Sequence, residues 1–566
     1  MEDRHVQTLN EEQQAAVDSD APRRLVCAGP GSGKTRVLVA AVEREARQHG
    51  AAGCVVISYT NAAADELHSR LESLGVQNLG YTGTLHGFLL RCLQEWSATP
   101  VNVIDDEQRQ ALVEGIMKDM GVKAPLKYVM GLLDEPVRNT NLDKYECVAL
   151  EYHLRLKAAG IVDFAGILAQ GTEACCAMKA AGRWHYAALF VDELQDAAQP
   201  DWCFYGISEL FKRKFLVGDA DQAIYSFRGG KVDMFVKLAE LAGNPKAAGP
   251  QYELHVLDVN CRSGTAITGP ANKLISHNMN RVEKDMVAMA AGGYGEYHAC
   301  GSAAEELSWV SDRMWQLAQQ SLYEPKDFAI LARTNHLARQ FAQHLKAVGV
   351  QVAEVEQPQR PLDWRRAKLL LSVLANPWCD TLALSYLVAE GADAEKAASD
   401  AAERMCSVSE ATGWRFGKGD GHVDDLHKFD LSTESRQLVH DAARELSRRG
   451  PWTLNDLVVY LGQQDGAARV VGEGVTCCTV HAAKGREWPV VFVVGCEENG
   501  FPTSAAREGP EFMEEERRLM FVAMTRAKER LVMTWCRERP EWRGVNLPVG
   551  KVTARERSRF LTEAGL

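Results

Sequence analysis

The sequence lacks any long hydrophobic segment. Its apolar runs, such as residues 490–494, have the length of one β-strand, well below the roughly 18 residues that a membrane-spanning helix needs. The opening MEDRHVQTLN contains acidic side chains and no apolar stretch, so it does not have the pattern of a secretory signal. We therefore expect a cytoplasmic protein that crosses no membrane.

The sequence also lacks any C-x-x-C pair, although it contains 15 cysteines. Several of them, such as Cys27, Cys203 and Cys496, stand within apolar stretches, and the adjacent pairs 175–176 and 477–478 have the wrong geometry to chelate one metal ion. This pattern predicts small buried side chains in a reducing compartment and argues against a disulfide or zinc framework.

Positive charge is not in excess either. The 64 Lys and Arg residues are outnumbered by 76 Asp and Glu residues, which gives a net charge of −12. This balance excludes a globally basic, histone-like binder of nucleic acid, but it leaves room for a local positive groove. A chain of 566 residues exceeds what one hydrophobic core supports, so two to four domains are expected.

The most informative segment that is present is VCAGPGSGKT, residues 26–35, which follows an apolar strand. Glycines allow backbone N–H groups to turn toward an anion, and a following helix presents its positive N-terminus to the same anion. The pattern predicts a nucleotide-phosphate loop, in which Lys34 contacts the β- and γ-phosphates and Thr35 binds Mg²⁺. The other expected nucleotide-binding residues of this loop are Ala28, Gly29, Pro30, Gly31, Ser32 and Gly33.

A second segment, AALFVDELQD at residues 187–196, is an apolar strand that ends in two carboxylates. A carboxylate at a strand end can hold Mg²⁺, usually through water, and its neighbour can activate the attacking water. We assign Asp192 to the metal ion and Glu193 to the general base.

A third segment, KFLVGDADQAIYSFRGG at residues 214–230, places an aromatic and basic cluster directly after a strand and a polar turn. Gln222 suits a sensor of the γ-phosphate or of the attacking water. Tyr225 and Phe227 offer flat faces, on which each stacked base contributes about 1 to 3 kcal/mol, and Arg228 adds positive charge. This segment predicts a link between the nucleotide and a single-stranded nucleic acid.

These segments, in this order, resemble the UvrD/Rep family of superfamily 1 DNA helicases, and the resemblance extends over nearly the whole chain. It implies that Gln13, in LNEEQQAAV, hydrogen bonds the adenine and that Arg36 packs against it. It also implies that Glu487 faces the ribose, that Arg262 in NCRSG reaches the γ-phosphate, and that Arg526 is the arginine finger.

The resemblance further implies a track for single-stranded DNA along segments 58–67, 83–88, 328–335 and 479–493. The residues expected to line it, with the aromatic cluster, are Tyr59, Thr60, Asn61, Thr84, His86, Tyr225, Phe227, Arg228, Arg333, Asn335, Thr479 and His481. The two histidines could instead be core residues. The sequence departs from the family at Cys261, where an aromatic side chain usually stacks on adenine, and at Phe227, where tryptophan is usual.

The predicted fold class is α/β, with two RecA-like parallel-sheet cores that each carry an inserted, mainly helical accessory subdomain. Arg262 and Arg526 lie far along the chain from Lys34, so hydrolysis is expected to require closure between the cores. The expected boundaries are 1–94 and 183–256 for core 1, 95–182 for its insertion, 257–377 and 471–546 for core 2, 378–470 for its reduced insertion, and 547–566 for a C-terminal tail.

Together these features predict an ATP- and Mg²⁺-dependent DNA translocase and helicase that acts on single-stranded DNA and on junctions with duplex. Movement from 3′ to 5′ follows from the resemblance alone. One alternative is a nucleotide-switched module that binds or loads DNA. Another is an RNA helicase, since no residue visibly reads the 2′-hydroxyl that distinguishes RNA from DNA. Oligomeric state and pathway stay open, and we expect a protein partner to set the pathway. The segment 421–430, GHVDDLHKFD, is expected to be a polar turn rather than a metal site.

Overall fold

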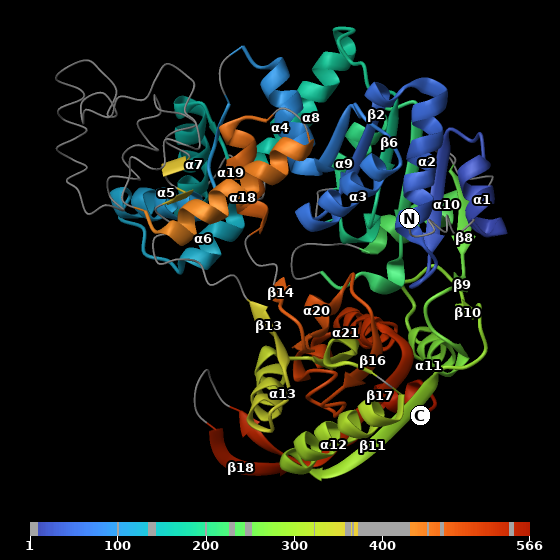
Figure 1. Cartoon of the computed structure of the whole chain (residues 1–566). Helices are drawn as coiled ribbons and strands as arrows, with labels where there is room; N and C mark the ends of the chain where they lie inside the picture. The colour runs from blue at the N-terminus through green and yellow to red at the C-terminus, as the bar shows by residue number, and fades with distance from the viewer. Residues whose placement is uncertain are drawn as a thin grey trace.

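The computed structural model describes residues 9–98, 101–133, 143–197, 201–225, 232–243, 252–321, 323–356, 364, 367–368, 370–371, 431–449, 452–464, 469–542 and 548–566. Two α/β bodies lie one above the other in Figure 1, and a group of helices extends to one side of the upper body. In the part of the chain described here, no helix is both long enough and apolar enough to cross a membrane.

The upper body, core 1, is built on a six-stranded sheet in which each pair of neighbouring strands is parallel. In spatial order its strands are β3 (Tyr81–Thr84), β2 (Cys54–Ser58), β6 (Ala188–Val191), β7 (Arg213–Gly218), β1 (Arg23–Ala28) and β8 (Glu253–Leu257). The central strands read as continuous apolar runs because helices cover both faces of the sheet.

Alternate residues of these strands enter two hydrophobic clusters. One cluster joins the sheet to α1 (Glu11–Asp18), α2 (Lys34–His49) and α3 (Asn61–Ser73). The other joins it to α4 (Leu85–Trp96), α8 (Phe164–Ala180), α9 (Asp201–Ser208) and α10 (Val232–Gly243). The carboxyl ends of the neighbouring strands β1, β7 and β6 therefore meet at one edge, where ligands of parallel sheets bind.

The lower body, core 2, contains an eight-stranded sheet. Its strands run in the order β11 (Tyr294–Ser302), β17 (Ala527–Trp542), β16 (Trp488–Val493), β12 (Phe328–Ala332), β15 (Val475–Thr479), β13 (Val352–Glu356) and β14 (Arg469–Val471), and β18 (Pro548–Ala554) pairs with β17. One face packs against α11 (Thr265–Ile275), α21 (Pro510–Met524) and α22 (Arg559–Glu563), and the other against α12 (Ala303–Ser321) and α13 (Asn335–Ala347). Core 2 also contains the short helix α20 (Val480–Ala483) and the paired strands β9 (Val259–Asn260) and β10 (Val287–Ala288).

The last residues add to this sheet rather than standing apart from it. The sequence predicts a tail over 547–566, whereas β18 pairs antiparallel with β17, and Phe560 and Leu561 of α22 are buried in the core. The two-core α/β fold itself is as the sequence predicts.

The helical region beside core 1 contains elements from both insertions (Figure 1). The first insertion supplies α5 (Asp106–Asp119), α6 (Leu126–Leu132), α7 (Lys144–Ala159) and the short strands β4 (Asn102–Val103) and β5 (Ile161–Val162), besides α8. From the second insertion, α18 (Thr433–Arg449) and α19 (Leu454–Gln464) share one hydrophobic cluster with these elements. The side-chain amide of Asn455 donates to the Val101 carbonyl at 2.7 Å, and that of Asn61 donates to the Tyr460 carbonyl at 3.1 Å. These helices, inserted in core 2 by sequence, therefore pack on core 1.

Candidate nucleotide and nucleic-acid site

The loop between β1 and α2 has the backbone that a phosphate site requires. Gly31 and Gly33 have φ angles of 70° and 79°, in the left-handed region that favours glycine. A Cβ atom on Gly31 would lie 2.7 Å from the Cβ atom of Arg262, so the close approach of core 2 also requires glycine. Since α2 begins at Lys34, its free N-terminal amides lie beside this loop, and Thr35 occupies the second helical position.

The ammonium group of Lys34 is buried without a hydrogen-bond partner among the described residues. Its nearest counter-charge is the Glu193 carboxylate, at 3.7 Å. A buried cation that lacks hydrogen bonds is costly, and phosphate oxygens in the adjacent loop would satisfy it. The geometry at Lys34 thus fits an anionic ligand.

The two carboxylates at the end of β6 lie in different electrostatic environments. Burial, followed by the neighbouring Glu193 charge, raises the pKa of Asp192 to about 7. Burial also acts to raise the pKa of Glu193, but the ammonium groups of Lys34 and Lys484 outweigh it, so this pKa is lowered. Glu193 has a φ of 51°, a strained backbone for a residue with a side chain and one often found at active sites. The arrangement keeps Glu193 ionised and able to accept a proton.

Two residues that follow this pair hold it in place, and sequence reasoning assigned neither of them a role. The Gln195 side-chain amide donates to the Glu193 carboxylate, and its carbonyl oxygen accepts from the Asp219 N–H at 2.8 Å. Asp196 forms an ion pair with Lys484 of core 2 at 2.6 Å. The polar run DELQD after a buried strand was the available indication.

Arginines from core 2 reach the same edge of the sheet. Arg526 is 2% exposed, and its guanidinium donates to the Gln222 side-chain oxygen at 3.3 Å. Arg262 donates to the Glu487 carboxylate at 2.6 Å and to the Thr525 carbonyl at 3.1 Å. Burial, followed by the Arg262 charge, lowers the pKa of Arg526 to about 9. The structure therefore brings together Lys34, Glu193, Gln222 and Arg526, which are distant in sequence.

The residues expected to hold the base also lie beside the loop, and Gln13 contacts it next to Gly33. The Gln13 side chain accepts from the Asn10 N–H at 3.0 Å and donates to the Ser32 carbonyl at 2.8 Å, so the direction of its amide is set. Arg36 is half-buried in the first turn of α2. Cys261 is exposed, and its N–H donates to the Gly31 carbonyl at 3.0 Å.

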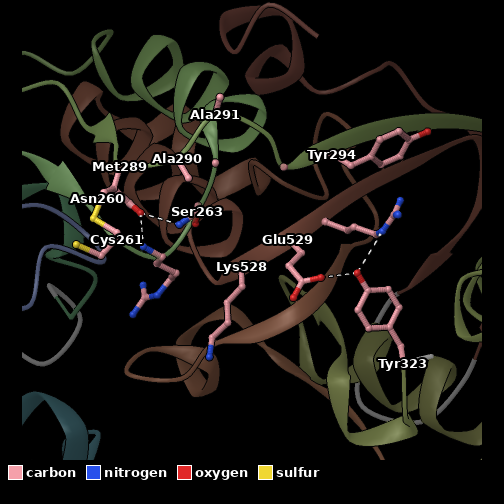
Figure 2. Close-up of a pocket in the computed structure, with 14 residues that line it drawn as sticks. Asn260, Cys261, Ser263, Met289, Ala290, Ala291, Tyr294, Tyr323, Lys528 and Glu529 are labelled. Carbon is pink, nitrogen blue, oxygen red and sulfur yellow. Dashed lines mark hydrogen bonds between the residues drawn. The ribbon is translucent and has the colours of Figure 1, made fainter. Parts of the chain in front are cut away.

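A pocket of about 550 Å³ opens in core 2 beside Cys261 (Figure 2). Tyr323 forms part of its wall and donates its hydroxyl to Glu529 at 2.6 Å. Lys528 also lines the pocket, and its ammonium lies 2.8 Å from the Glu487 carboxylate. Cys261 lines this pocket and bonds to the nucleotide loop, so the pocket adjoins the loop at the position where the resemblance led us to expect an aromatic ring.

Several expected DNA contacts gather where the two cores meet. The Lys484 ammonium lies over the Tyr225 ring, 5.0 Å from its centroid, and the rings of Tyr225 and His481 are 6.5 Å apart. Phe227 and Arg228 lie outside the described residues. Tyr225 and His481 thus stand beside the Asp196–Lys484 pair, which follows the carboxylates expected to be catalytic.

Other expected contacts already have structural roles. Thr60, Thr84 and Thr479 are N-caps of α3, α4 and α20, and each hydroxyl accepts a backbone N–H. Thr84 and Thr479 end the strands β3 and β15, and Thr60 follows β2, as expected for a row at the carboxyl edges of the sheets. A capped helix start still presents backbone N–H groups to a phosphate, so this role does not conflict with a DNA contact.

The remaining residues expected to contact DNA differ in the burial and pairing of their side chains. Arg333 is paired with Glu516 at 2.6 Å, and Asn335 is exposed at the start of α13. The His86 ring meets the Phe164 ring edge to face at 5.5 Å, and burial lowers the pKa of His86 to about 4. The Tyr59 hydroxyl is buried without a partner among the described residues, and burial raises its pKa. The His86 side chain is half-buried, so its role as a DNA contact stays a prediction.

Comparison with known proteins decides the family. Residues 9–242 match the UvrD/REP helicase N-terminal domain, and residues 255–367 and 437–538 match the UvrD-like helicase C-terminal domain. The chain belongs to the UvrD-like helicase family.

Relatives within the family cover the chain almost completely. It is 26% identical to the ATP-dependent DNA helicase UvrD1 of Mycobacterium bovis, over 98% of this chain and 85% of that protein. It is 25% identical to the ATP-dependent DNA helicase PcrA of Leuconostoc citreum, over 98% and 84%, and 27% identical to DNA helicase II of Escherichia coli, over 98% and 87%. The last alignment spans 649 positions, more than the 566 residues of this chain, so the relative contains segments that this UvrD-like protein lacks.

Proposed function

We propose that this protein is an ATP-dependent DNA helicase that hydrolyses ATP between its two cores, with Mg²⁺, and moves 3′ to 5′ along single-stranded DNA. The observation that carries the proposal is the meeting of a buried, unsatisfied Lys34 ammonium, an ionised Glu193 and the Arg526 guanidinium of the opposite core. In this proposal it acts in the cytoplasm, and a protein partner sets its pathway.

The chain's own residues account for the hydrolytic step. Lys34 and the loop amides bind the phosphates, and Glu193 accepts a proton from the attacking water. Arg262 and Arg526 stabilise the negative charge that spreads over the transferring phosphoryl group. The hydroxyl of Thr35 and the carboxylate of Asp192 are oxygen ligands of the kind Mg²⁺ prefers, and the ion, when bound, would neutralise phosphate charge.

The fixed amide of Gln13 supports selection of adenine. One acceptor position is occupied by the Asn10 N–H and one donor by the Ser32 carbonyl, which leaves one of each. Adenine presents a donor at N6 beside an acceptor at N7, whereas guanine presents two acceptors at the corresponding edge. A side chain that offers one donor and one acceptor therefore favours ATP over GTP.

The hydrolysis site is connected to the proposed DNA contact Tyr225 by residues where the two cores meet. Lys484 holds Asp196 beside the catalytic carboxylates, donates to the Gln222 carbonyl at 2.9 Å and covers Tyr225. A base stacked on Tyr225 would thus contact a side chain three residues from the expected phosphate sensor. This short connection supports coupling between DNA binding and hydrolysis.

A second candidate is a nucleotide-switched module that binds or loads DNA without sustained unwinding. It is favoured by the segments that relatives have and this chain lacks, and by the docking of α18 and α19 on core 1.

A strand-displacement assay beside a DNA-stimulated ATPase assay separates the two candidates. The substrates are duplexes with a 3′ tail, a 5′ tail or a 3′ RNA tail, with Glu193→Gln as the inactive control. Unwinding of the 3′-tailed DNA alone supports the proposal. ATPase without displacement supports the switched module, and displacement only from the RNA tail would reassign the substrate.

A further inference from the structure

Four buried charges lie where core 2 touches the segment that carries Gln222. The Lys284 ammonium is 2.7 Å from the Asp219 carboxylate and 2.8 Å from the Asp221 carboxylate, and its side chain is 3% exposed. Arg281 forms a two-pronged contact with Asp221, at 3.1 and 3.0 Å. Both aspartates follow β7 in core 1, whereas both cations belong to the segment that follows α11 in core 2.

Asp219, which Lys284 contacts, also binds the Gln222 side chain. The Gln222 amide nitrogen donates to the Asp219 carboxylate at 2.5 Å, while the Gln222 oxygen accepts from Arg526 at 3.3 Å. Exchanging the two ends of this amide would place N–H groups against the guanidinium and an oxygen against the carboxylate, and both contacts would be repulsive. The orientation of Gln222 therefore depends on an ionised, correctly placed Asp219.

The segment that carries Lys284 is tied to the helix that carries the arginine finger. Glu514 of α21 accepts from the Met279 N–H at 2.8 Å, and Arg518 of α21 donates to the Asn280 carbonyl at 2.7 Å. The same helix ends at Met524, two residues before Arg526. Helix α21 of core 2 is thus connected to both ends of the Gln222 amide. Arg526, just after the helix, contacts the amide oxygen, and the segment that carries Lys284 contacts the amide nitrogen through Asp219.

We propose that Lys284 is a positioning residue of the ATPase site, which orients the Gln222 amide from core 2 by way of Asp219. Through Lys284 and Arg526, a shift of α21 would move the groups that contact the two ends of the Gln222 side chain at the same time. The inference rests on the proposed function, because it assigns a role in the hydrolysis that the two cores perform.

Steady-state ATPase kinetics with and without single-stranded DNA test this role. In Lys284→Gln the DNA-stimulated kcat should fall by about tenfold or more while KM for ATP changes by less than about threefold, since Lys284 orients a sensor and contacts no nucleotide. Lys284→Arg, which keeps the charge, should recover most of the rate. Lys326→Gln is the matched control, because Lys326 is 60% exposed and pairs with Glu324 on the surface of core 2.

Loss of fold is separated from loss of orientation by a second variant. Lys284→Gln combined with Asp221→Asn removes one charge of each sign and keeps the cluster neutral, so its thermal unfolding should lie closer to wild type than that of Lys284→Gln alone, while its kcat stays low. A kcat that recovers with stability in the double variant, or equal losses in kcat and affinity, would overturn the inference. A wild-type protein without DNA-stimulated ATPase would instead contradict the proposed function, and this inference with it.

Discussion

Glu193 and Lys34 both face the expected phosphates, yet their substitution should have different consequences. Glu193→Gln keeps the size of the side chain and removes the proton acceptor, so ATP binding should stay nearly intact while DNA-stimulated turnover falls by at least about 10²-fold. Lys34→Ala should weaken both binding and turnover, because it also loses a contact made in the ground state. Binding of a fluorescent ATP analogue beside ATPase assays distinguishes the two. Turnover above a tenth of wild type in Glu193→Gln would remove it from the role of base.

Cys261 allows a gain of affinity to be predicted. Its thiol is exposed beside the nucleotide loop, where the resemblance led us to expect an aromatic ring. An aromatic contact contributes about 0.5 to 1.5 kcal/mol beyond burial, so Cys261→Tyr should tighten ATP binding by roughly 2- to 12-fold. The preference for ATP over GTP should change little, because Gln13 is the residue proposed to read the edge of the base. Titrations with both nucleotides measure this, and unchanged or weaker ATP binding would mean that another residue covers that face.

At the scale of an element, the segment after β7 is proposed to join the phosphate sensor Gln222 to the DNA track. Replacing Tyr225 and Phe227 together with alanine should weaken single-stranded DNA binding by about 2 to 6 kcal/mol, if the stacking contributions of two bases add. ATPase without DNA should survive, since neither ring is expected to contact the nucleotide. Fluorescence anisotropy with a labelled oligonucleotide gives the affinity. An unchanged affinity would place both rings in the protein core.

Helices α18 and α19 show how an element can belong to one core by sequence and to the other by contact. Arg449 at the end of α18 binds Asp65 of α3 through its Nε at 2.8 Å, and its guanidinium also lies over the Tyr460 ring at 5.1 Å. Only 8% of the Arg449 side chain is exposed, so its removal leaves a partly buried carboxylate unpaired. This is the type of ion pair whose disruption is most costly.

For the whole molecule, Arg449→Met should therefore loosen the contact between the second insertion and core 1. We expect the free energy of unfolding to fall by about 3 kcal/mol. This is at the low end for a buried pair, because Asp65 can take up a proton when its partner is gone. Hydrogen exchange in α18 and α19, together with thermal unfolding, measures the change. The control is Arg444→Met, whose 65% exposed side chain pairs with Asp441 and should contribute less than about 1 kcal/mol. Equal exchange rates in the two variants would contradict the docking.

The sequence by itself determined the two-core fold, the family and the position of the glycine-rich loop, because these depend on local patterns. Apolar strands that end in Gly-Lys-Thr or Asp-Glu specify where a parallel sheet places a ligand. The helix caps at Thr60, Thr84 and Thr479 are also local, since each hydroxyl accepts the N–H three residues further along the chain. That His86 packs on Phe164 required the packing of distant segments. Only the tertiary structure brought Lys284 to Asp219, and α19 to core 1, since residues tens to hundreds of positions apart meet by burial and charge pairing, which no local spacing encodes.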